Sequence, residues 1–122
     1  MARRVLLVED EPSIVEAVSF ILTRAGWTVH AHADGATALD RARAGAPELV
    51  VLDAMLPGRS GFDVLRDLRA DPVTAAIPVL MLTARGQERD RDLALRLGAT
   101  GFMTKPFANA ELVAEVRRLA GG

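Results

Sequence analysis

The 122-residue chain contains no cysteine, few aromatic residues and no long apolar run. The absence of cysteine excludes disulfide bonds, thiol nucleophiles and cysteine-ligated metals. Fifteen basic and sixteen acidic residues give a formal net charge of -1, which argues against a nucleic-acid-binding surface. The first apolar run, Val5 to Val8, stops at two acids and is too short for a signal peptide or a membrane span. We therefore expect a cytoplasmic protein without direct contact to nucleic acid or membrane.

Half of the residues are hydrophobic, and the length suits one domain covering residues 1–122. Residues 5–8, 49–52 and 79–82 are unbroken aliphatic runs of four residues each. Such runs are typical of strands that helices cover on both faces, as in a parallel sheet. Residues 27–31 and 101–104 predict two weaker strands nearer the edges.

Helical periodicity fills the segments between these runs. The clearest stripe contains Ile14, Val18 and Leu22, with Pro12 suited to the first turn and Gly26 to the end of the helix. Further helical segments are predicted around residues 34–44, with Leu39 and Ala42 as the core contacts, and at 62–69, 87–97 and 112–120. The order strand-helix, repeated five times, predicts an α/β fold: a doubly wound three-layer sandwich around a parallel sheet.

Polar residues follow the predicted strands where each strand ends. They are Glu9, Asp10 and Glu11 after the first, Asp53 after the third, Thr83 after the fourth and Lys105 after the fifth. Ligands of open parallel sheets bind outside the carboxyl ends of the strands. We therefore expect the carboxylates, the hydroxyl and the ammonium group to meet at one edge of the sheet.

Three neighbouring carboxylates require either a raised pKa or a bound cation. Mg²⁺ suits Glu9, Asp10 and Asp53, because it takes oxygen ligands and keeps several waters. No histidine follows these strands, which disfavours zinc. With a metal on one side and Lys105 and Thr83 on the other, Asp53 is equipped to accept a phosphoryl group as the nucleophile.

Four segments carry a resemblance to a known family. They are residues 5–12 (Val-Leu-Leu-Val-Glu-Asp-Glu-Pro), 52–61 (Leu-Asp-Ala-Met-Leu-Pro-Gly-Arg-Ser-Gly), 81–86 (Met-Leu-Thr-Ala-Arg-Gly) and 104–107 (Thr-Lys-Pro-Phe). In this order and spacing the chain resembles the response-regulator receiver domains of two-component signalling. The resemblance implies a flavodoxin-like (βα)5 fold with sheet order 2-1-3-4-5.

The resemblance also implies residue roles. Asp53 would accept the phosphoryl group from a histidine kinase or phosphotransfer protein, and Glu9, Asp10, Asp53 and the carbonyl of Met55 would hold Mg²⁺. Thr83 and Lys105 match the switch hydroxyl and the phosphate-binding lysine. Phe102 matches the aromatic switch position, and the Lys105–Pro106 peptide would be cis.

The motifs Met-Leu-Pro-Gly and Leu-Thr-Ala-Arg-Gly resemble those of the receiver domains of winged-helix transcription factors. Those commonly form homodimers through the fourth helix, fifth strand and fifth helix, and Arg91 and Glu111 could supply one ion pair. The chain departs from that pattern at Thr100 and Gly101, where two acids are usual, and at Glu115, where a basic residue is expected.

The predicted function is therefore a phosphorylation-controlled signalling switch rather than an enzyme with turnover. A phosphotransferase of the aspartyl-phosphate type is an alternative, but it needs an acid or base where Met55 stands. A flavin or nucleotide carrier of the same fold would need Gly, Ser or Thr in the acidic first loop. A phosphorylation-independent interaction module remains the other alternative.

Overall fold

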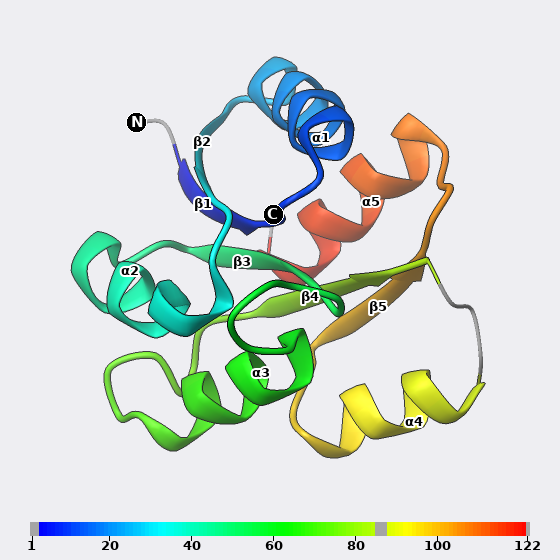
Figure 1. The fold of residues 1–122 in the computed structure, drawn as a ribbon. Coiled ribbons are helices and arrows are strands. Elements are labelled where there is room, and N and C mark those ends of the chain that lie inside the picture. Colours follow the sequence, from blue (N-terminus) through cyan, green and yellow to red (C-terminus); the bar gives the residue numbers. More distant parts are fainter. Residues whose placement is uncertain (1–2, 85–87, 122) are drawn as a thin grey trace.

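The computed structural model describes residues 3–84 and 88–121, which form five strands and five α-helices in alternation (Figure 1). Their order is β1 (Arg3–Val8), α1 (Pro12–Arg24), β2 (Trp27–His32), a 3-10 turn (Gly35–Thr37), α2 (Ala38–Gly45), β3 (Leu49–Asp53), α3 (Gly61–Ala70), β4 (Val79–Thr83), α4 (Glu88–Arg96), β5 (Gly101–Thr104) and α5 (Asn109–Leu119). The predicted alternation of strands and helices is confirmed.

All strand pairs are parallel, and the sheet order is β2-β1-β3-β4-β5, as the resemblance implied. Val8 at the end of β1 pairs with His32 of β2 and with Leu52 of β3. Thr83 at the end of β4 pairs with Thr104 of β5. The carboxyl ends of the strands therefore form one edge of the sheet.

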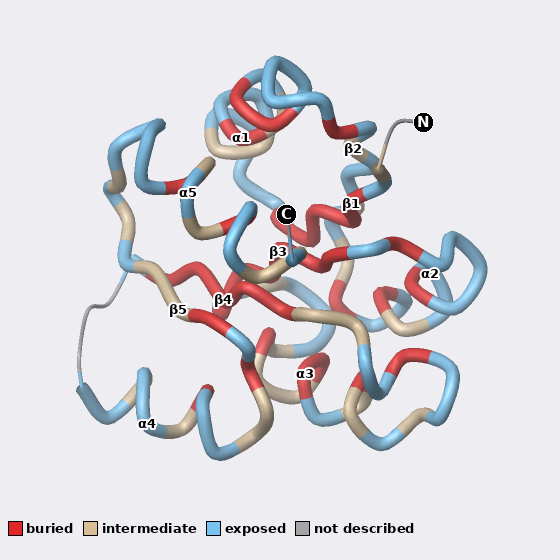
Figure 2. Tube along the Cα trace, turned by 180° about the vertical axis from the view of Figure 1, so that it is seen from behind, coloured by how far each residue is buried: buried red, intermediate tan, exposed pale blue. Residues whose placement is uncertain are grey.

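Helices cover both faces of the sheet, which explains the unbroken aliphatic runs (Figures 1 and 2). In β3, Val50 and Leu52 pack on the side of α2, α3 and α4, whereas Leu49 and Val51 pack on the side of α1 and α5. All four side chains are fully buried. Burying an aliphatic side chain of this size contributes about 1.5–3 kcal/mol, so the central strands anchor the edge at which they end.

Local signals set the helix ends. Pro12 lies in the first turn of α1, and Gly26 follows its end with φ of 99°, a left-handed conformation that costs glycine little. Both assignments made from the sequence are confirmed. The segment around residues 34–44 differs in detail, because a 3-10 turn capped by Asp34 precedes α2. Leu39 and Ala42 were the expected core contacts. In the structure, α2 buries Ala38 and Ala42, whereas Leu39 is half-buried.

The edge strand β2 contains Trp27, which is only 8% exposed and packs against the α1 and α5 side of the core. The expectation of an edge strand at residues 27–31 was correct, and the indole ring of Trp27 is buried. Arg3 covers it, with its guanidinium carbon 4.9 Å from the ring centre. Within residues 3–84 and 88–121, we find no helix long and apolar enough to cross a membrane.

Candidate functional site

The backbone holds the predicted site residues together at the carboxyl edge of the sheet. The amide of Glu9 donates to the carbonyl of His32 (3.0 Å), which continues the pairing of β1 with β2. The amide of Lys105 donates to the carbonyl of Thr83 (2.7 Å), which continues the pairing of β4 with β5. Asp53 is the last residue of β3. The sheet thus positions each functional side chain through the strand that precedes it.

Glu9, Asp10 and Asp53 form an acidic cluster, with one carboxylate oxygen from each lying within 4.8 Å of the others. Glu9 is 1% exposed and Asp53 is 5% exposed, whereas Asp10 is exposed to solvent. The cluster is therefore closed on the protein side and open on the side of Asp10.

Lys105 lies against this cluster. Its Nζ is 2.8 Å from Oε1 of Glu9 and 3.4 Å from Oδ1 of Asp53. The sequence predicted Lys105 on one side of Asp53, and the structure adds a shorter contact with Glu9. Lys105 is the chain's only lysine, so no other ammonium side chain can take this place.

Burial and charge act against each other at this pair. Burial raises the pKa of Glu9. The hydrogen bond from Lys105 acts in the opposite direction, but the nearby Asp53 carboxylate raises the pKa further, so the pKa of Glu9 lies above its usual value. Burial alone would lower the pKa of Lys105, but its bonds to Glu9 and the charge of Asp53 outweigh burial and raise it. The lysine is therefore a firmly protonated counterion for two carboxylates.

A shallow pocket opens over the cluster. It is lined by Asp10, Glu11, Pro12, Asp53, Met55, Ala84 and Lys105. The Met55 side chain is 60% exposed, and its amide donates to Oδ1 of Asp53 (3.3 Å). Asp53 thus presents its carboxylate to an opening that solvent or a ligand can enter.

The switch candidates lie on β4 and β5. Thr83 is 2% exposed at the end of β4, next to the strand that carries Asp53. Phe102 is half-buried against the core on the α2, α3 and α4 side. The Lys105–Pro106 peptide is cis, the isomer implied by the resemblance. Arg85 and Gly86 of the matching segment lie outside the described residues.

Sequence reasoning missed three residues at this edge. Pro12 and Ala84 line the pocket, and both lie within four residues of a strand end. The expectation that ligands bind beyond the carboxyl ends of parallel strands would therefore have pointed to them. His32 also lies at this edge, because it is the last residue of β2, whose end was not among the predicted ligand positions. Its ring is hydrogen-bonded to Thr37 (2.6 Å) and is not part of the acidic cluster.

Comparison with known sequences agrees with the geometry. A family model described as the response regulator receiver domain matches residues 5–117. The phosphate regulon transcriptional regulatory protein PhoB of Escherichia coli K12 is 44% identical over 117 residues, covering 96% of this chain and 51% of PhoB. The alkaline phosphatase synthesis transcriptional regulatory protein SphR of Synechococcus elongatus is 46% identical over 127 residues, covering 97% of this chain and 49% of SphR. The chain spans about half the length of these curated relatives.

A solved structure shares the fold over its full length. The receiver domain of the sensor histidine kinase PA1611 from Pseudomonas aeruginosa superposes with a TM-score of 0.92 at 30% identity, and 100% of both chains is covered. That structure has a magnesium ion coordinated in its active-site cleft.

Proposed function

This chain belongs to the response regulator receiver domain family, and from that premise we propose that Asp53 accepts a phosphoryl group from a histidine kinase or a phosphotransfer protein. Receivers of this family serve two-component signalling, generally without enzymatic turnover. A kinase donor, together with a transcriptional output like the one that the names of PhoB and SphR state, would place the protein in the cytoplasm. Residues 1–122 would then act as one receiver unit.

The observation that carries this proposal is the position of the Asp53 carboxylate. It lines an open pocket, and two further carboxylates lie within 4.8 Å of it. The Lys105 ammonium is 3.4 Å from Asp53 and also contacts Glu9. A nucleophilic carboxylate that receives a phosphoryl group needs positive charge around the transferring oxygens. Lys105 supplies one such charge, and the acidic cluster can hold a second.

The donor set fits Mg²⁺. The cluster offers oxygen atoms only, and its open side at Asp10 leaves room for the water molecules that Mg²⁺ retains. Glu9, Asp10 and Asp53 would hold the ion together with the Met55 carbonyl. When bound, the ion neutralises charge on the phosphoryl oxygens.

The side chains of this chain have separate tasks in the transfer. An Asp53 carboxylate oxygen forms the new bond to phosphorus while the donor's phosphorus–nitrogen bond breaks. The Lys105 ammonium can turn from Glu9 toward the phosphoryl oxygens, because Asp53 is already within its reach. The Thr83 hydroxyl would donate to another of these oxygens, and Phe102 would pack behind it.

The surface that responds would be α4, β5 and α5, which then contacts an output partner or a second copy of the chain. Arg91 and Glu111 are both exposed on this surface. Glu115 is already paired within its own helix, because Arg118 donates to both of its carboxylate oxygens (2.7 and 2.9 Å). A homodimer through this surface would therefore depend on few cross-pairs.

Intact-protein mass spectrometry after incubation with acetyl phosphate tests the proposal. We expect one phosphoryl adduct on the wild type in the presence of Mg²⁺ and none in its absence. Asp53→Asn should remove the adduct, since an amide is not a nucleophile toward phosphorus. Asp40→Asn, which changes an exposed carboxylate of α2, is the matched control and should keep it.

An adduct that persists in Asp53→Asn would show that another residue is the acceptor. No adduct on any variant, either with acetyl phosphate or with a phosphorylated kinase, would favour an interaction module that works without phosphorylation.

A further inference from the structure

The loop after β3, residues 54–60, contains the Met55 carbonyl of the proposed metal site. Its two ends are joined, because the amide of Gly61 donates to the carbonyl of Ala54 (2.9 Å). Leu56 packs partly against the core, whereas the Met55 side chain is 60% exposed and gains little support from packing. The position of the Met55 carbonyl therefore depends on the backbone of this loop.

A second loop supports the first one from the side of β2. The amide of the buried Gly35 donates to the carbonyl of Pro57 (3.1 Å), although the two residues are far apart in the sequence. A Cβ at Gly35 would collide with the carbonyl oxygen of Arg59. The two backbones thus approach more closely than any residue with a side chain at position 35 would permit.

The loop after β3 also needs a glycine at this contact, at position 58. A Cβ at Gly58 would collide with Oδ1 of Asp34, and Gly58 has φ of 81°. Asp34 is itself held in place, since its Oδ1 accepts the amide of Ala36 (3.0 Å). One glycine from each loop therefore makes the contact possible.

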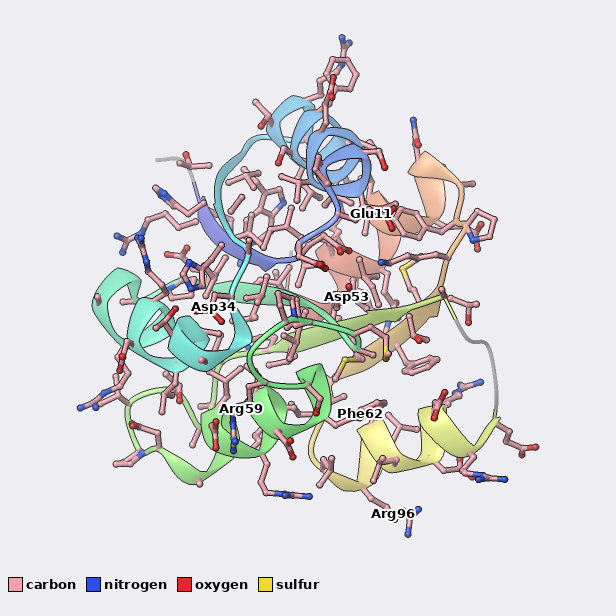
Figure 3. The ribbon with its side chains drawn as sticks, viewed as in Figure 1. Glu11, Asp34, Asp53, Arg59, Phe62 and Arg96 are labelled. Carbon is pink, nitrogen blue, oxygen red and sulfur yellow. The ribbon has the colours of Figure 1, made fainter. Side chains whose placement is uncertain are left out.

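Arg59 extends the contact to α3. Its guanidinium donates to both carboxylate oxygens of Asp67 (2.6 and 2.9 Å), while its carbonyl lies over Gly35. Asp34 follows β2 and Arg59 follows β3, so both loops lie at the carboxyl edge of the sheet, where Asp53 ends β3 (Figure 3). The loop of Met55 is thus held between the segment after β2 and the helix α3.

We propose that Gly35 and Asp34 are positioning residues for the metal: by supporting the loop of residues 54–60, they set the place of the Met55 carbonyl. This inference rests on the proposed metal site. Neither residue belongs to the acidic cluster, so neither is a ligand. Groups that orient metal ligands without binding the metal typically contribute about 10- to 100-fold to metal affinity.

Gly35→Ala tests the inference, and Gly45→Ala is its matched control. Neither glycine has a positive φ, and a Cβ at Gly45 would meet nothing within 4 Å. Mg²⁺ affinity is measured directly, from amide shifts in a ¹⁵N NMR titration. We expect Gly35→Ala to weaken binding about 10-fold, and Gly45→Ala to bind as the wild type does.

The phosphorylation rate separates positioning from damage to the acceptor. With acetyl phosphate, Gly35→Ala should need more Mg²⁺ for half-maximal rate but reach nearly the wild-type rate when Mg²⁺ saturates, because Asp53 and Lys105 are unchanged. A lower maximal rate with unchanged Mg²⁺ affinity would overturn the inference.

A second pair of variants decides the question if Gly35→Ala does not fold. Asp34→Ala removes the carboxylate beside Gly58, whereas Asp34→Asn loses the same charge but keeps an oxygen in that place. Asp34→Ala should bind Mg²⁺ more weakly than Asp34→Asn. Equal binding by the two would overturn the inference. A wild type that binds no Mg²⁺ would instead overturn the metal site itself, and the inference with it.

Discussion

At the scale of single residues, Lys105 is the side chain that stabilises the acidic cluster in the folded protein. Glu9 and Asp53 are nearly buried, and each would be costly as an unpaired charge. The lysine contacts both carboxylates, so one cation stabilises two anions. The same cation must also compete with a bound Mg²⁺ for those carboxylates.

Lys105→Met should therefore destabilise the metal-free protein and increase its response to Mg²⁺. The variant leaves two buried carboxylates side by side without a counterion. We expect a loss of about 1–3 kcal/mol, below the 3–5 kcal/mol typical of fully enclosed pairs, since the site opens to solvent. Adding Mg²⁺ should raise the melting temperature more in the variant than in the wild type.

Thermal melts with and without Mg²⁺ measure both effects, and Arg89→Met at an exposed position of α4 controls for the loss of one positive charge. A Mg²⁺ response no larger than that of the wild type would show that the lysine is not the counterion of the cluster.

The positions of the polar residues after the strands predicted which side chains meet, but not which atoms form hydrogen bonds. Parallel strands fix the neighbourhood of Glu9, Asp53, Thr83 and Lys105 through backbone pairing alone. That Lys105 lies closer to Glu9 than to Asp53 depends on side-chain geometry, which periodicity does not encode. The role of Gly35 was likewise invisible, because its partner, Pro57, is distant in sequence and the contact is between backbones.

At the scale of elements, Arg69 connects α3 to the loops that precede β4 and β5. Its guanidinium donates to the carbonyls of Ile77 (2.7 Å), Gly98 (2.8 Å) and Ala75 (3.1 Å) and to the Thr100 hydroxyl (3.2 Å). The burial that accompanies these bonds lowers the pKa of Arg69. One side chain thus satisfies backbone acceptors from two connections.

Arg69→Ala should destabilise the fold by about 2–3 kcal/mol, because two partly buried carbonyls, those of Ile77 and Gly98, lose their donor. Arg69→Lys should recover only part of this loss, since an ammonium group cannot reach the acceptors that the planar guanidinium spans. Arg66→Ala, one turn away with only an exposed contact to Asp63, should change stability by less than about 0.5 kcal/mol.

Urea denaturation measures all three variants. Equal losses in Arg69→Ala and Arg66→Ala would show that the guanidinium contacts of Arg69 are not the cause, since alanine favours a helix at least as well as arginine does.

The elements themselves were largely predictable. β1, β3 and β4 contain unbroken aliphatic runs, β2 and β5 gave weaker signals, and the segments between the strands show helical periodicity. The sequence left open whether Leu68 or Arg69 ends the stripe of α3. The structure separates them: Leu68 is buried in the core, and Arg69 reaches the loops. Thr100 shows the same limit, because its hydroxyl also accepts the amide of Val79 (3.0 Å), a contact that no local pattern indicates.

At the scale of the whole molecule, the charges of α5 constrain any homodimer. Glu115 and Arg118 are bonded to each other, and the pKa of Glu115 is lowered chiefly by the hydrogen bond from Arg118. Glu111 also accepts the amide of Ala108 at the start of the helix (3.1 Å). A symmetric interface would therefore rely on Arg91 and Glu111, although one carboxylate oxygen of Glu111 already accepts a hydrogen bond at the start of its own helix.

We expect weak, concentration-dependent association of the phosphorylated protein that depends on these two charges. A twofold interface contains the Arg91–Glu111 pair twice, and an exposed pair contributes about 0.2–1 kcal/mol. Arg91→Glu should thus weaken the dimer by roughly 2- to 30-fold, with like-charge repulsion adding to the loss. The double variant Arg91→Glu/Glu111→Arg should restore association, because it exchanges the two signs. Sedimentation velocity of acetyl-phosphate-treated protein measures this. A wild type that stays monomeric, or a double variant no better than Arg91→Glu, would show that the surface serves a different partner.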